Sequence, residues 1–173
     1  EKALRKVALR AQLQHDPRTS ALSNLQLTLD ETQLTGKLAL HHKPETAYRF
    51  ELAVDSIDVD RYLPPPTAPD PQQPERSPAE AAVVPVALLR ETNAEGTFRA
   101  GKLKAFGVRA EDMVLKVNAR NGRIDLGPNQ AKLYGGTYSG RTLIDASGRV
   151  PQFRMDEKLT GVQLGPLLKD AQV

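Results

Sequence analysis

Apolar and polar residues alternate along much of this chain. The alternation begins at Lys6–Leu13 and recurs in similar segments at Leu25–Leu29, Leu34–Leu40, Tyr48–Val54, Met113–Ala119, Ile124–Leu126 and Phe153–Met155. Because successive side chains of a strand point to opposite faces, each segment is predicted to be a strand with one apolar and one polar face. Many such strands at short spacing predict a mainly β fold with an antiparallel sheet.

Turn and helix signals fit between these strands. Asn121-Gly122 predicts a tight hairpin, because both residues tolerate positive φ. Asp30-Glu31-Thr32 and Ser147-Gly148 mark two further turns. Two short helices are predicted at Val86–Thr92 and Pro166–Ala171, each following or beginning with a proline.

A proline-rich segment divides the chain. Eight of the thirteen prolines lie between Pro64 and Pro85, where proline removes backbone donors and excludes a central strand. We therefore predict a β repeat unit over residues 1–63, a linker or loop over 64–84, and a second β unit over 85–173. The Pro-x-x-P spacings leave a docking peptide as the alternative interpretation.

The two units show a weak internal repeat. Ser56–Leu63 resembles Gly161–Leu168, and Ile57, Val59 and Leu63 correspond at a constant offset of 105 to Val162, Leu164 and Leu168. Repeated β units placed side by side extend a sheet rather than enclosing separate cores. The expected architecture is a curved antiparallel sheet, either a β-groove or an open sandwich, with two short helices.

Composition narrows the function classes. The chain has 173 residues, is 39% hydrophobic and 26% charged, and carries a net charge of +3, which suits a globular domain and gives no strong basic stripe for nucleic acid. The absence of cysteine excludes thiolate chemistry, and the absence of tryptophan disfavours base stacking.

No apolar run is long enough for a transmembrane helix. Since the chain begins at Glu1 without a signal peptide, we expect a fragment of a longer protein.

Candidate catalytic and metal-binding residues are weak. His41 and His42 are adjacent, so in a strand they point to opposite faces and do not readily share a metal, and His15 lies beside a turn. The acidic residues of Asp55–Asp60 lack the glycine and distal glutamate of a calcium loop. Gly135–Gly140 lacks the ending of a phosphate loop, and Ser139 has no nucleophile elbow. We predict no catalytic residue, no metal and no cofactor.

One stretch offers candidates for an anionic lipid headgroup. Four basic residues lie within Gly96–Arg109, namely Arg99, Lys102, Lys104 and Arg109. They are candidate headgroup ligands, and the alternative is an ordinary solvated strand face.

The second half of the chain resembles the C-terminal region of the AsmA family of bacterial envelope proteins. The resemblance runs over Val86–Leu168 and is carried, in order, by Leu88–Thr97, Asn121–Pro128, Ala131–Gly140, Ile144–Gly148 and Leu159–Leu164. The segment Asp55–Pro64 is similar to the end of the preceding unit in the same family. The order of these pieces is more specific than any one of them.

This resemblance implies a function that the residues alone do not. AsmA-like proteins are anchored in the inner membrane and project a periplasmic body that resembles the repeating β-groove of bridge-like lipid-transfer proteins. The family is implicated in outer-membrane homeostasis and in phospholipid movement between membranes, without enzymatic activity. The chain is therefore expected to be a periplasmic segment with phospholipid as its partner, and envelope proteins are possible further partners.

The apolar faces of the strands are the candidate lipid site. Six residues are predicted to line the groove: Leu115, Val117, Ile124, Leu126, Phe153 and Met155. Aliphatic side chains at every second position would let acyl chains slide along the sheet. The same alternation fits the filled core of a β-sandwich, in which case the chain is a scaffold for outer-membrane protein assembly that adds a partner strand at an open edge.

Overall fold

A computed structural model of the chain describes residues 6–42, 47–62 and 90–171. The described residues form nine strands, one 3₁₀ turn (η1) and one α-helix. In chain order they are β1 (Val7–His15), β2 (Thr19–Leu29), β3 (Thr32–His41), β4 (Ala47–Asp58), η1 (Val59–Arg61), β5 (Ala94–Ala105), β6 (Val108–Arg120), β7 (Arg123–Leu133), β8 (Gly136–Asp145), β9 (Gln152–Thr160) and α3 (Leu164–Asp170). The prediction of a mainly β fold is confirmed.

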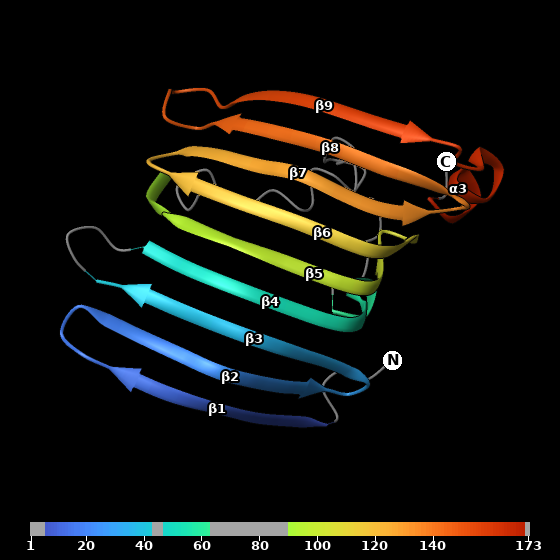
Figure 1. The fold of residues 1–173 in the computed structure, drawn as a ribbon. Helices are drawn as coiled ribbons and strands as arrows, with labels where there is room; N and C mark the ends of the chain where they lie inside the picture. The colour runs from blue at the N-terminus through green and yellow to red at the C-terminus, as the bar shows by residue number, and fades with distance from the viewer. Residues whose placement is uncertain (1–5, 43–46, 63–89, 172–173) are drawn as a thin grey trace, which may run out of the picture.

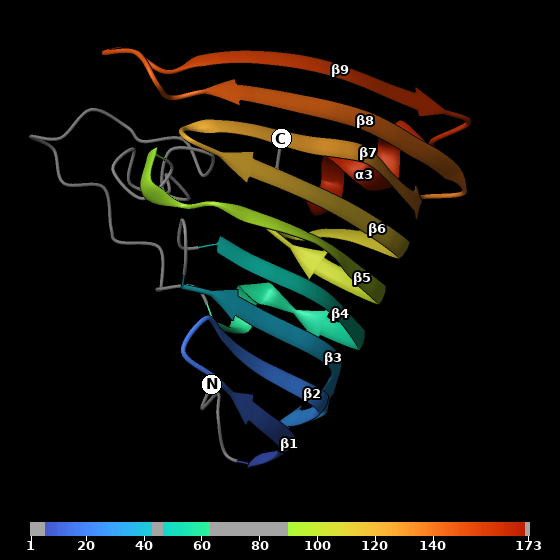
Figure 2. The ribbon, with the colours of Figure 1, turned by 60° about the vertical axis from the view of Figure 1, so that its left-hand side comes forward.

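All nine strands belong to one open sheet, in which they lie side by side in chain order from β1 to β9 (Figure 1). Neighbours are antiparallel except β4 and β5, which are parallel. The parallel pair joins the two halves of the chain, so both halves form one continuous sheet. The strands bend along their length, which gives the sheet its curvature (Figure 2).

Apart from Lys6, which precedes β1, the alternating segments lie within strands that extend beyond them. The basic stretch that begins at Gly96 runs through β5, which pairs with β4 and β6. Of the two predicted helices, Pro166–Ala171 corresponds to α3, which begins earlier at Leu164. Most of Val86–Thr92, and the proline-rich segment 64–84, lie outside the described residues.

Two predicted turns are present as expected. Asn121 and Gly122 connect β6 to β7 with φ values of 51° and 76°, as the two positive angles of a tight hairpin require. Asp30 also has a positive φ, 55°, and connects β2 to β3. These turns keep the strands in short antiparallel hairpins.

The repeat read from the sequence recurs in the strands. The meander β1–β4 corresponds to β6–β9: β2 and β7 begin 104 residues apart, at Thr19 and Arg123, and β4 and β9 begin 105 apart, at Ala47 and Gln152. The pairing register shifts within β2, and it shifts again at the corresponding place in β7. Such bulges locally bend a strand and add to its twist, so both meanders bend at equivalent points.

The register places apolar side chains in rows across the sheet. One row crosses every strand from β1 to β9, through Leu13, Leu22, Leu38, Phe50, Gly96, Val117, Leu126, Thr142 and Met155. Because cross-strand partners share a face, this row defines what we call the apolar face. A second row crosses the same face from His15 to Phe153, through Leu40, Ala119, Ile124 and Ile144 among others.

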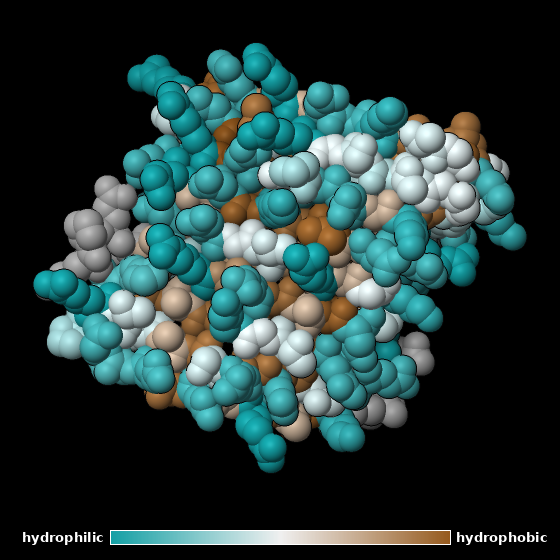
Figure 3. All heavy atoms as spheres, in the orientation of Figure 1, coloured by the Kyte–Doolittle hydropathy of each residue, from teal (hydrophilic) through white to brown (hydrophobic). Residues whose placement is uncertain are grey.

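The opposite face is polar. Lys37 and Glu51 form an ion pair of 2.9 Å across β3 and β4, and Arg49 and Glu95 lie 3.8 Å apart across β4 and β5. Figure 3 shows hydrophilic side chains over most of the surface turned to the viewer. Exposed pairs of this kind contribute little to stability, but they mark this face as the hydrated one.

The apolar face is only partly buried. Val54, Ala100 and Ile124 are buried, at 4%, 2% and 6% exposure, but no large side chain among the described residues is fully enclosed. The described strands form a single open sheet rather than the two packed sheets of a sandwich. Sheets that are dry on one face need a second layer or a ligand to cover it. Within the described part of the chain no second sheet supplies that layer.

Candidate functional site

The six predicted lipid-facing residues lie together on the apolar face. Val117 pairs with Leu126, and Thr142 connects Leu126 to Met155 in the same row. Ile124 and Phe153 flank Ile144 in the second row, and Leu115 pairs with Phe98 of β5. Contact of these residues with lipid stays a prediction.

Exposure of apolar side chains rises toward both edges of the sheet. In β9, Phe153 and Met155 are 65% and 66% exposed, and in β1, Leu9 and Leu13 are 65% and 68% exposed. An exposed aliphatic surface is costly in water. The apolar face is therefore most exposed at the first and last strands of the sheet.

The four candidate headgroup residues are dispersed rather than gathered. Lys104 Nζ contacts the carboxylates of Asp58 at 3.2 Å and Asp60 at 3.5 Å, and the hydrogen bond to Asp58 raises the lysine pKa. Arg109 binds Asp170 instead. Arg99 and Lys102 lie three residues apart in β5, where they are opposite Ala53 and Ser56 of β4. A headgroup role for these residues stays a prediction.

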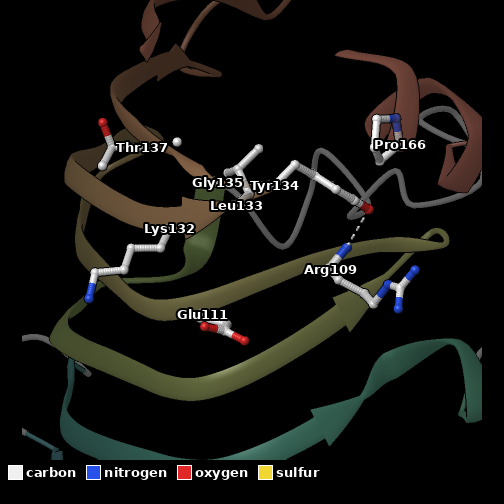
Figure 4. Close-up of a pocket in the computed structure, with 9 residues that line it drawn as sticks. Arg109, Glu111, Lys132, Leu133, Tyr134, Gly135, Thr137 and Pro166 are labelled. Carbon is white, nitrogen blue, oxygen red and sulfur yellow. Dashed lines mark hydrogen bonds between the residues drawn. The ribbon is translucent and has the colours of Figure 1, made fainter. Parts of the chain in front are cut away.

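Asp170 ties the end of α3 to the sheet. Its Oδ2 accepts hydrogen bonds from Arg109 Nη2 at 2.7 Å and from Tyr134 Oη at 2.8 Å. The Arg109 hydrogen bond, followed by that from Tyr134, lowers the pKa of the Asp170 carboxyl. The Tyr134 hydroxyl also accepts a hydrogen bond of 3.1 Å from the Arg109 backbone N–H, drawn as a dashed line in Figure 4. Both residues and Pro166 line an open depression of about 670 Å³.

The histidines and the acidic segment have structural partners. His15 Nδ1 and His42 Nε2 each lie 2.9 Å from Ser20 Oγ, whereas His41 Nδ1 lies 3.4 Å from Thr19 Oγ1. The Asp60 carboxylate accepts hydrogen bonds from the backbone N–H groups of Phe106 and Gly107, which follow β5. No group of three or more metal-ligating side chains occurs within residues 6–42, 47–62 and 90–171.

One carboxylate interrupts the apolar face. Glu157 of β9 accepts a hydrogen bond from Tyr138 Oη to Oε2, at 2.6 Å, and one from Thr142 Oγ1 to Oε1, at 2.9 Å. We call these three residues the Glu157 site. A Cβ on Gly140 would lie only 1.5 Å from Glu157 Oε2, so the glycine provides the space that the carboxylate occupies. Burial, together with the bond to Glu157, raises the pKa of Tyr138 to about 12.

The first meander has leucines where the second has this site. Leu52 lies opposite Gly36 in β3, as Glu157 lies opposite Gly140 in β8. Counting from these two glycines, Leu34 corresponds to Tyr138, Leu38 to Thr142 and Leu25 to Asn129. The buried Asn129 is itself bonded, accepting from the Lys116 N–H at 3.1 Å and donating to Leu126 O at 3.0 Å. The second meander is therefore polar at equivalent positions.

The alternation pattern does not by itself identify the Glu157 site. Alternation through Phe153 and Met155 continues to Glu157, which is polar at a position expected to be apolar. Under the 105-residue repeat, Glu157 is the position equivalent to Leu52. The signal was therefore present, but it required the register of β8 and β9.

Comparison with known proteins gives a family. The AsmA family matches residues 2–173, which is nearly the entire chain. Neither curated proteins nor solved structures give a match. None of the described helices is long and apolar enough to span a membrane. Proteins of the matching family are generally non-enzymatic. On the strength of that match and the open sheet described above, the chain belongs to the AsmA family.

Proposed function

We propose that the chain binds phospholipid acyl chains along its apolar face and allows them to pass between the inner and outer membranes. The row from Leu13 to Met155 carries this proposal, because it extends across nine strands without a second sheet over it in the described residues. Acyl chains supply the apolar contacts that such a face lacks. The protein is then the periplasmic portion of an envelope protein anchored in the inner membrane, and it supports outer-membrane homeostasis.

The energetics favour transfer rather than capture. Burial of an acyl chain gains about 0.8 kcal/mol per CH₂, which is similar to its gain in a bilayer. Exchange between bilayer and protein is therefore nearly neutral and reversible. The function needs no covalent step and no cofactor.

The free edges of the sheet support a second candidate. All residues of β9 are exposed, and an exposed edge can accept a strand from another protein. A scaffold for outer-membrane protein assembly would use this edge and would leave the apolar face without lipid.

The lipid content of the purified full-length protein separates these candidates. In Val117→Arg, a cation lies in the row between Gly96 and Leu126, where an unpaired charge is costly beside acyl chains. Val114→Arg is the matched control, because Val114 lies on the opposite face between Arg99 and Gln130. We expect phospholipid by mass spectrometry in the wild type and in Val114→Arg but not in folded Val117→Arg. Absence of lipid from all three folded proteins would favour the scaffold.

A further inference from the structure

The charge of Glu157 has no cationic partner in the described residues. The ion pairs there include Lys132 with Asp112 and Arg141 with Asp125, but none includes Glu157. Its two hydrogen-bond donors, the hydroxyls of Tyr138 and Thr142, are neutral. They orient the carboxylate without neutralising it.

The carboxylate also retains unused acceptor capacity. Two carboxylate oxygens offer about four acceptor positions, and the hydroxyls use one on each oxygen. Met155 and Leu159 lie on either side along the same face of β9, at 66% and 50% exposure. A ligand for this place therefore needs N–H donors, a positive charge and an adjoining apolar chain.

We propose that the Glu157 site binds the primary ammonium group of a zwitterionic phospholipid whose acyl chains lie on the apolar face. The inference rests on the proposed lipid-binding function and adds a headgroup preference to it. A primary ammonium donates three hydrogen bonds and matches the charge of Glu157. A quaternary ammonium has no N–H to donate, and a glycerol headgroup has no positive charge.

The repeat explains why the preference is local. At the equivalent place in the first meander, Leu52 and its leucine neighbours offer only apolar contact. A lipid bound there contacts only apolar side chains, whereas the headgroup of a lipid bound at the second meander can contact Glu157. The ammonium contact consequently fixes one position and one orientation of the lipid on the sheet.

Three lysophospholipids with the same acyl chain test this inference on the full-length protein. Lysophosphatidylethanolamine carries a primary ammonium, lysophosphatidylcholine a quaternary one, and lysophosphatidylglycerol no amine. We expect the wild type to bind the ethanolamine lipid about fivefold more tightly than the other two, as suits one exposed charge-assisted contact. Free ethanolamine should bind weakly, because it lacks the acyl chain.

Two variants give the decisive comparison. Glu157→Gln removes the charge and should abolish the preference for the ethanolamine lipid over the choline lipid, which has the same net charge. Asp156→Asn removes the same charge from the neighbouring position on the opposite face of β9, and it should retain the preference. Equal binding of all three lipids by the wild type, or an unchanged preference in Glu157→Gln, overturns the ammonium site alone. No binding of any lipid overturns the proposed function as well.

Discussion

Glu157 and Leu52 occupy equivalent places in the two halves of one sheet. Each lies opposite a glycine of the preceding strand, Gly140 for Glu157 and Gly36 for Leu52. The two meanders thus share the same strand pairing at this point. On the apolar face, however, the first has leucines where the second has a carboxylate that accepts hydrogen bonds from two hydroxyl donors.

Gly36 is needed for close approach of β3 to β4. Its φ is +147°, and an added Cβ would lie 2.0 Å from Glu51 O. Because the obstacle is backbone, we expect Gly36→Ala to lower the free energy of unfolding by about 2 kcal/mol or more. Gly148→Ala is the control, since its Cβ meets nothing closer than 3.8 Å, and it should change stability by less than about 0.5 kcal/mol. Urea unfolding measures the stability of both variants. Equal unfolding midpoints for Gly36→Ala and Gly148→Ala would contradict the close approach of β3 to β4 at Gly36.

Stability at acid pH should depend on Asp170. Its pKa in the folded chain is lowered from 3.8, mainly by Arg109 and then by Tyr134, so the folded state favours the ionised carboxyl. The stabilisation is present above the unfolded pKa and is lost as pH falls through the lower folded value. We expect the wild type to be more stable than Asp170→Asn at pH 7, and this difference to shrink at low pH. Urea unfolding measures the stability of both proteins, and a difference between them that does not change with pH would contradict stabilisation by the ionised Asp170.

The ionisation of Tyr138 reports on Glu157. The chain has four tyrosines, and burial together with Glu157 raises the pKa of Tyr138 to about 12. The neutral phenol therefore stabilises the fold fully below its ordinary value of 10.0, and the contribution is lost as pH rises through about 12. In Glu157→Gln we expect this pKa to fall, because the carboxylate no longer accepts the hydroxyl proton. Tyrosinate absorbance, with Tyr138→Phe subtracted, measures the shift; identical titrations in both proteins would refute the coupling.

Alternation predicted most of the strands because burial of one face imposes a two-residue period. It identified Val117 and Leu126 as members of one apolar surface, and the register pairs them directly. It did not predict that β5 runs parallel to β4, because strand direction depends on the crossover and not on the pattern within a strand. Similarly, the residue opposite Glu157 is set by the register of β8 with β9, which the pattern within β9 does not report.

Labelling along β6 tests most directly whether the apolar face holds lipid. A photoreactive amino acid placed in the full-length protein at Leu115 or Val117 lies on the apolar face, and at Val114 or Lys116 it lies on the polar face. After irradiation with phospholipid present, we predict lipid adducts at 115 and 117 and none at 114 and 116. Adducts at all four positions alike, or at none of them in a folded protein, would contradict lipid binding by this face.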